Sequence, residues 1–221
     1  MKKDRISLIV TMVLFGSIGL FVRGINFTSS QIAMARGIIG CVCLLGISFL
    51  MKKPLSLKRI MANKVWLIAS GIAIGLNWVF LFEAYKYTSI STATICYYFA
   101  PIFVMFVAPF LLKERLAGKK IICIIVAMVG MILITKNGNA TSGGNELRGI
   151  VFGLMAAALY ASVIVMNKFL KDISGVERTV VQLGVAALAI APYTLLNDGI
   201  DFARGDMKSL ALLVVVGIVH T

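Results

Sequence analysis

Long apolar runs, separated by short polar segments, follow one another along most of the chain. A helix of about 20 residues is roughly 30 Å long, which matches the hydrocarbon core of a bilayer. We therefore predict an all-α, polytopic membrane helix bundle. The expected helices cover about Ile6–Val22, Ile32–Met51, Val65–Tyr85, Ala93–Leu112, Ile121–Thr135, Ile150–Leu170 and Thr179–Leu196, and an eighth begins near Leu210.

The fourth of these runs differs from the others because it carries two prolines and several aromatic residues. Pro101 and Pro109 lack a backbone N–H, so the carbonyls four residues before them lose their usual helical partners. In a bilayer, neighbouring helices, hydroxyls or water must satisfy such carbonyls. Tyr97 and Tyr98 precede the first proline, and their rings can stack on a solute or pack and hydrogen-bond locally. We place Tyr97, Tyr98 and Pro101 in a candidate substrate-binding wall.

Composition and charge narrow the class of protein. Hydrophobic residues make up 60% of the chain and charged residues 14%, which excludes a soluble globular domain. The net charge of +13 does not indicate a nucleic-acid partner, because the basic residues lie in short loops between apolar runs. With the N-terminus inside, fifteen Lys and Arg fall on the inner side and six on the outer side. The positive-inside rule therefore predicts a multi-pass plasma-membrane protein with a cytoplasmic N-terminus.

The four cysteines suggest neither disulfides nor a metal site. Cys41, Cys43, Cys96 and Cys123 all lie within apolar runs, and the sequence contains no C-x-x-C pair. We interpret them as small buried residues. No cofactor is expected.

A weak internal repeat divides the chain. The segment LFGSIGL, residues 14–20, aligns with LYASVIV, residues 159–165, and SGIAIG, residues 70–75, aligns with VGIVHT, residues 216–221. The offsets are 145 and 146 residues. We predict a first repeat over 1–136, a linker over 137–148 and a partial second repeat over 149–221. Because five helices precede the second copy, the two repeats would be inverted relative to each other.

These features resemble the EamA-type branch of the drug/metabolite transporter superfamily. The resemblance rests on QIAMARGIIG, on FLFEAYKYTSISTATICYYFAPIFVMFVAPFLLKERL and on AMVGMILI. It implies ten helices in two inverted five-helix repeats, and secondary transport of small metabolites or amino acids, usually outward, by alternating access. Only twelve residues follow from Leu210, too few to span a bilayer, so on this pattern we expect a C-terminally truncated chain. Ile122 and Cys123 stand where the family often has a glycine.

Polar residues inside the first repeat are further candidates for solute binding. Arg36 lies within the second apolar run, where a charge costs about 2.5–3.5 kcal/mol and needs a partner. It can attract a carboxylate or anchor the helix through a backbone carbonyl. Asn77 and Trp78 lie in the middle of the third run, where they can face a solute or hold helices together.

The second repeat supplies comparable groups. Tyr160 and Asn167 lie in the sixth run, and Gln182 stands near the repeat counterpart of Arg36. All three are assigned to the same candidate substrate-binding site.

Two alternatives to a transporter stay open at this point. A membrane-embedded enzyme would need clustered acidic or histidine residues at one face, whereas Asp198, Asp201 and Asp206 are close together only within a loop. A truncated product without transport activity is the other alternative. The expected partners are a small-molecule solute and the lipid bilayer, with no nucleic acid, and the oligomeric state is left open.

Overall fold

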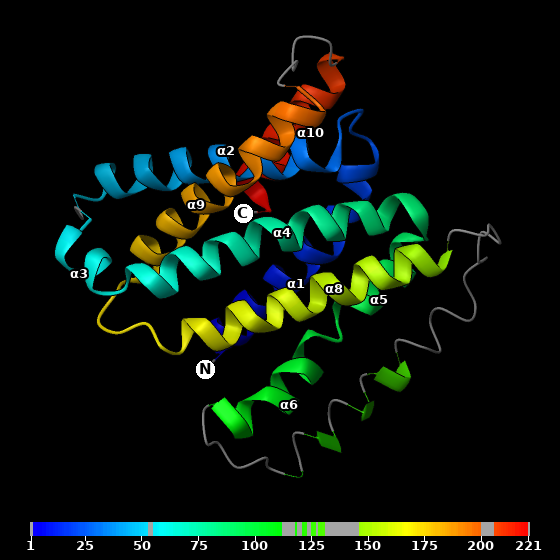
Figure 1. The fold of residues 1–221 in the computed structure, drawn as a ribbon, viewed down its shortest axis with the longest axis horizontal. Coiled ribbons are helices and arrows are strands. Elements are labelled where there is room, and N and C mark those ends of the chain that lie inside the picture. Colours follow the sequence, from blue (N-terminus) through cyan, green and yellow to red (C-terminus); the bar gives the residue numbers. More distant parts are fainter. Residues whose placement is uncertain are drawn as a thin grey trace.

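The computed structural model describes residues 2–52, 55–111, 118, 121–122, 125–126, 128–130, 146–199 and 206–220. Within these residues the regular structure is helical. Figure 1 shows the helices, which are α1 (Lys2–Arg23), α2 (Ser29–Leu50), α3 (Leu57–Ala62), α4 (Lys64–Tyr87), α5 (Ile90–Tyr97), α6 (Ala100–Leu111), α8 (Glu146–Asn167), α9 (Gly175–Asn197) and α10 (Met207–Val219). Five described segments are long and apolar enough to cross a membrane. The predicted all-α polytopic membrane bundle is therefore confirmed.

The helix predicted around Pro101 is interrupted, as its prolines indicated. α5 ends at Tyr97, residues 98–99 form a turn, and α6 begins at Ala100. Pro101 cannot donate to the Tyr97 carbonyl, so the α-helical hydrogen-bond pattern stops there. Pro109, in contrast, lies inside α6 without ending it. Most of the predicted helix over residues 121–135, and the linker up to residue 145, lie outside the described residues.

Two long helices begin with the same capping motif. The Thr28 hydroxyl accepts a hydrogen bond from the Gln31 backbone at the start of α2, and the Gln31 side chain bonds back to the Thr28 N–H. Ser174 and Glu177 form the same capping box at the start of α9. A capping box satisfies otherwise unpaired N–H groups at a helix start. The two boxes lie 146 residues apart, which is the offset of the sequence repeat.

Close contacts between helices follow the same offset. A Cβ atom built on Gly71 would lie 2.7 Å from the Val185 Cβ, and one built on Gly217 would lie 2.7 Å from the Ile39 Cβ. Adding 146 to Ile39 and Gly71 gives Val185 and Gly217, so the two contacts exchange partners between repeats. Gly37 packs against Leu183, its own counterpart. A two-fold axis between two repeats turns each contact into a second contact between the counterpart residues, and it brings a residue near the axis against its own counterpart. The glycine contacts follow this pattern.

Helix packing shows the same exchange. α4 packs on α8 and on α9. The counterparts of α4, α8 and α9 in the other repeat are α10, α1 and α2, and α10 packs on both α1 and α2. α2 and α9, which are counterparts of each other, pack together and cross in the upper part of Figure 1.

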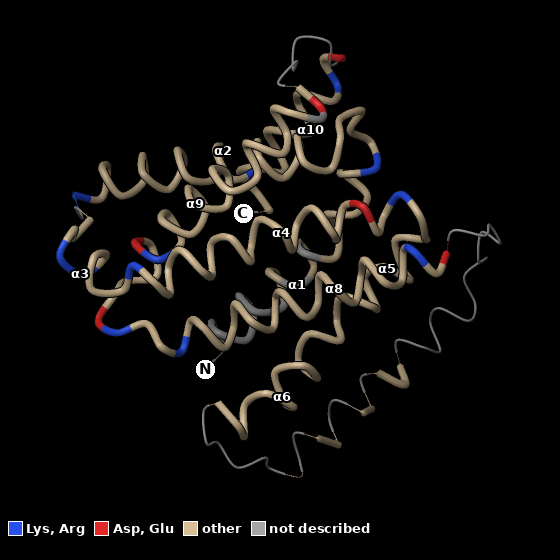
Figure 2. The backbone as a smooth tube through the Cα atoms, viewed as in Figure 1, with Lys and Arg blue, Asp and Glu red and all other residues tan. Residues whose placement is uncertain are grey.

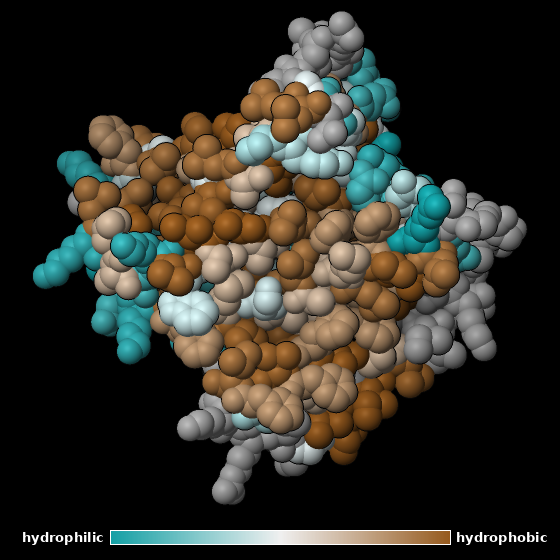
Figure 3. Space-filling view, viewed as in Figure 1, coloured by the Kyte–Doolittle hydropathy of each residue, from teal (hydrophilic) through white to brown (hydrophobic). Residues whose placement is uncertain are grey.

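Charged residues gather at the two ends of the long helices. Figure 2 shows basic residues around α3 and the α8–α9 connection at one end, and a second charged group near the ends of α1, α4 and α8. The face seen in Figure 3 is hydrophobic between these ends. Among the described charged residues, Arg36 and Glu177 are the two that are buried. This band of apolar surface fits a bilayer.

We expect Gly71→Ala and Gly217→Ala each to lower the free energy of unfolding by about 1–3 kcal/mol, because a methyl group would push apart helices that touch at these positions. Thermal unfolding of the purified protein in detergent measures the effect. Gly46→Ala is the matched control on α2, since a Cβ there meets nothing within 4 Å. An equal loss of stability in the control would contradict the packing role.

Candidate functional site

A buried arginine and several aromatic rings form the first part of the candidate site. Arg36 lies seven residues after the start of α2 and is 3% exposed. Its guanidinium carbon lies 4.2 Å from the centre of the Trp78 ring on α4, which is cation–π geometry. Its Nη2 donates a hydrogen bond to the His220 carbonyl that follows α10. The guanidinium is thus held between α2, α4 and the end of α10.

Two tyrosines lie near this arginine, and a third contacts one of them. Tyr85 on α4 and Tyr97 on α5 both lie within electrostatic reach of Arg36. The Tyr97 ring centre is 5.4 Å from that of Tyr160 on α8 and 6.5 Å from that of Tyr98. We call Arg36, Trp78, Tyr85, Tyr97 and Tyr160 the arginine–aromatic cluster. It combines a fixed cation with ring faces, which suits a carboxylate attached to an apolar or aromatic group.

Asn77 lies next to this cluster but is engaged in helix packing. It is 1% exposed, and its Nδ2 donates a 2.6 Å hydrogen bond to the Ala156 carbonyl on α8. This bond ties α4 to α8, which corresponds to the interhelical interpretation of Asn77.

Gln182 and Asn167 form a second, separate polar group. The Gln182 Nε2 donates to the Asn167 Oδ1 at 2.7 Å and to the Ser70 Oγ at 2.6 Å. These residues connect α9, α8 and α4. Gln182 lies 146 residues after Arg36 and seven residues into α9, so it occupies the counterpart position in the inverted helix. We call Ser70, Asn167 and Gln182 the amide cluster.

The structure thus divides most of the sequence-predicted residues into two clusters, with Tyr98 and Asn77 beside the first cluster and Pro101 apart from both. Pro101 is exposed at the start of α6 and belongs to neither cluster. Sequence reasoning missed Tyr85 and Ser70, although a signal was available: each lies seven residues from a residue that was selected, and two helical turns return to the same face. The backbone carbonyl of His220, which accepts the hydrogen bond from Arg36, was also not among the candidates.

Hydrogen bonds fasten α2 and α9 to each other at both ends. At one end the Gln31 Nε2 donates to the Gly199 carbonyl at 3.0 Å, and the Thr28 hydroxyl donates to the Asp198 carboxylate at 3.1 Å. Ser30 also donates to this carboxylate. We call this set the Gln31 latch.

At the other end the Glu177 carboxylate accepts hydrogen bonds from the Ser56 N–H at 2.7 Å and from Arg59 at 2.9 Å. We call this the Glu177 latch. In both latches a capping-box residue in the first turn of one helix hydrogen-bonds to the segment that follows the other helix. Gln31 of α2 binds the segment after α9, and Glu177 of α9 binds the segment after α2.

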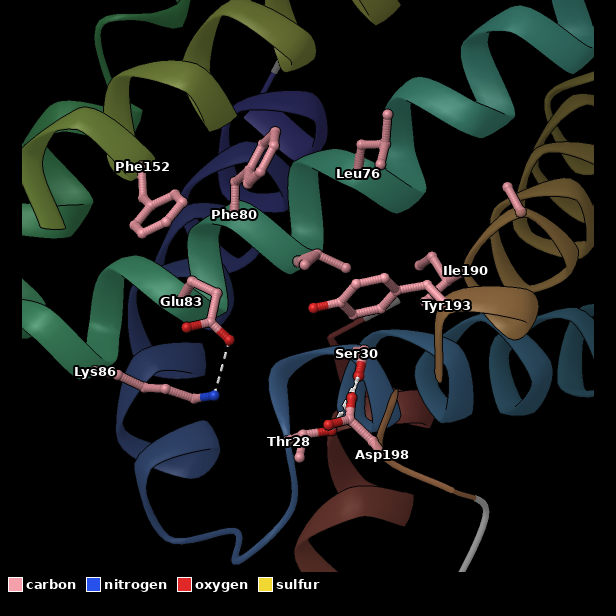
Figure 4. Close-up of a pocket in the computed structure, with 12 residues that line it drawn as sticks. Thr28, Ser30, Leu76, Phe80, Glu83, Lys86, Phe152, Ile190, Tyr193 and Asp198 are labelled. Carbon is pink, nitrogen blue, oxygen red and sulfur yellow. Dashed lines mark hydrogen bonds and ion pairs between the residues drawn. The ribbon is translucent and has the colours of Figure 1, made fainter. Parts of the chain in front are cut away.

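A groove of about 460 Å³ opens beside the Gln31 latch, between α4, α8 and α9 (Figure 4). Tyr193 reaches from α9 toward α4, and Phe80 and Phe152 lie on the opposite side. Glu83 and Lys86, which stand three residues apart on α4, form an ion pair in which the Lys86 Nζ lies 2.8 Å from the Glu83 Oε1. We call this the Tyr193 groove.

Within the described residues, no three His, Cys, Asp or Glu side chains are arranged to hold a metal ion. Cys41, Cys43 and Cys96 are free thiols there, and Cys123 lies outside the described residues. The polar chemistry available in the described part of the site is therefore that of arginine, amides, phenols and carboxylates.

A helical membrane bundle with related halves and a buried polar centre is an architecture found among polytopic membrane transporters. The model of the EamA-like transporter family matches residues 5–136, which is close to the predicted first repeat. The chain belongs to the EamA-like transporter family, within the drug/metabolite transporter superfamily.

Similar proteins are themselves named as transporters. A Bacillus subtilis (strain 168) protein named "Uncharacterized transporter YxxF" is 28% identical over 221 residues, which cover 98% of this chain and 69% of the relative. An "Uncharacterized transporter" of Clostridium kluyveri is 31% identical over 149 residues, 66% of this chain and 48% of the relative. Another "Uncharacterized transporter", from Archaeoglobus fulgidus, is 24% identical over 201 residues, which cover 91% of this chain and 67% of the relative. The matches thus cover between about half and about two thirds of each relative's length.

Replacing Arg36 tests whether this residue serves mainly to bind a solute or to anchor α2 within the bundle. We expect Arg36→Met to change the free energy of unfolding by less than about 1 kcal/mol, because the lost contacts are offset by removal of a charge that is costly to bury. Thermal unfolding in detergent checks this, with Arg148→Met at an exposed position of α8 as the control. A loss of several kcal/mol in Arg36→Met alone would instead identify Arg36 as a structural anchor.

Proposed function

We propose that this protein is a secondary transporter of the plasma membrane that exports a small metabolite or amino acid carrying a carboxylate and an apolar or aromatic group. Family membership supports transport in general, and the solute class comes from the arginine–aromatic cluster. The observation that carries this proposal is the Arg36 guanidinium, buried 4.2 Å from the Trp78 ring and within reach of Tyr97.

The chemistry of the cluster favours such a solute. A guanidinium offers planar, paired donors that match a carboxylate, and the low polarity around it strengthens this interaction. The rings of Tyr97 and Tyr160 face each other at 5.4 Å between α5 and α8, where they can contact the apolar part of the same molecule.

Alternating access is supported by the exchange of helix partners between the repeats. α4 packs on α8, and their counterparts α10 and α1 are in contact as well. If the repeats exchange conformations, one of these two interfaces opens as the other closes, and the polar centre becomes accessible from the other side. α2 and α9 are fastened by a latch at each end, so we assign them the role of a fixed pair around which the other helices rock.

The proposed orientation follows from the basic residues. Figure 2 shows basic residues gathered at the α3 end of the bundle. Lys58 and Arg59 of α3 line one pocket with Lys171, Lys64 begins α4, and Lys168 directly follows α8. On the positive-inside rule this end faces the cytoplasm, which places the N-terminus there too.

Transport can be tested by placing the full-length protein in sealed proteoliposomes and offering radiolabelled amino acids and carboxylate metabolites, with and without a proton gradient. We expect saturable uptake of at least one carboxylate solute, and a reduction of about tenfold in Tyr97→Ala from loss of ring contacts. Phe110→Ala is the control, because Phe110 is 85% exposed on the surface of α6. No saturable uptake from folded protein would refute the proposed function.

The fixed-pair mechanism has its own test, in a background with the four cysteines replaced by alanine. Thr28→Cys with Asp198→Cys, bridged by a bifunctional methanethiosulfonate, joins α2 to the end of α9, and we expect transport to continue. The same reagent on Phe80→Cys with Phe152→Cys, whose native rings stack at 5.9 Å, joins α4 to α8, and we expect transport to stop. The opposite pattern would show that α2 and α9 move apart during transport.

A further inference from the structure

The Tyr193 groove has the polarity of a site for an amphipathic molecule. Along α4 it runs from Leu76 to Lys86, which is about 15 Å at 1.5 Å per residue. One end is lined by apolar side chains, including Leu76, Val79 and Ile190. The charged side chains lie at the other end, close to the ends of α4 and α9.

The charges at this end of the groove do not cancel. Glu83 and Lys86 pair with each other at 2.8 Å. Asp198 accepts hydrogen bonds from the neutral hydroxyls of Thr28 and Ser30. Two carboxylates against one ammonium give the lining a formal charge of −1. A cation at the mouth is therefore favoured over an anion.

Size and aromatic content fit the same kind of ligand. A volume of about 460 Å³ falls within the roughly 300–1,000 Å³ of small-molecule sites. Tyr193 is 57% exposed and extends across the groove, opposite Phe80 and Phe152. Aromatic faces contact both alkyl chains and ammonium groups favourably.

We propose that the Tyr193 groove binds an amphipathic primary amine, with its ammonium group between Glu83 and Asp198 and its apolar chain along Leu76 and Ile190. This site is separate from the arginine–aromatic cluster, which offers a positive charge instead of a negative one. Two sources have this chemistry: a free alkyl or aryl amine, and the amine head group of an aminophospholipid entering from the bilayer.

Photolabelling of the full chain tests the proposal without depending on transport. The probe is a decyl primary amine with a diazirine on its chain, and the head-group control is the matching decyl sulfate. Mass spectrometry of the labelled protein in neutral detergent locates the modified peptides. We expect the amine probe, more than the sulfate, to label peptides from residues 76–83 and 189–193.

Charge variants should change the labelling in opposite directions. Glu83→Gln removes one negative charge, so labelling should fall about fivefold, while Lys86→Gln removes the positive charge, so labelling should rise. Ala189→Trp, which fills the groove, should prevent labelling. Ala158→Trp is the matched control, because Ala158 lines a different, apolar pocket beside α6. Stronger groove labelling by the sulfate, or no response to Glu83→Gln and Lys86→Gln, would overturn the proposal.

Proteoliposomes distinguish the two sources. If phosphatidylethanolamine, but not phosphatidylcholine, protects the groove from the amine probe, a lipid head group is the occupant. If neither protects it, the site takes free amines. Both results support the amine site, and neither depends on whether the carboxylate transport proposed above is found.

Discussion

The close approach of helices around the two-fold relation is the constraint on which the rest of this bundle depends. In lipid there is little hydrophobic force to bring apolar helices together, so small residues that allow backbone contact become decisive. Gly37 against Leu183, and the exchanged pairs Gly71–Val185 and Gly217–Ile39, place α2, α4, α9 and α10 within such distances. The polar groups can then reach partners that they could not reach across a looser interface.

The two repeats share a backbone plan and differ in the polar groups that they bring to the centre. Arg36 on α2 packs on an aromatic ring. Its counterpart Gln182 on α9 instead donates hydrogen bonds to the neutral side chains of Ser70 and Asn167. The latches show the same relation, with the amide of Gln31 at one end and the carboxylate of Glu177 at the other. Shared positions keep the fold, and changed side chains give each half its own chemistry.

The sequence predicted the long helices well because a 20-residue apolar run has few other structures available in a membrane. It missed α3, whose six residues include two basic ones and resemble a loop, and it started α2 and α10 about three residues late. Local pairs such as Glu83–Lys86 followed from helical spacing. The Ala156 carbonyl bound by Asn77, and the His220 carbonyl bound by Arg36, could not be predicted, because a carbonyl partner has no residue type to recognise.

The difference between Arg36 and Gln182 has an energetic meaning for a carrier of the proposed kind. Two identical inverted repeats would make the inward-facing and outward-facing forms equivalent, with equal free energies and equal populations at rest. Any side chain that differs between counterpart positions breaks this equality, and a bias of about 1.4 kcal/mol already gives a tenfold preference for one form. In such a carrier, a charge on one repeat and an amide on the other would favour one resting direction.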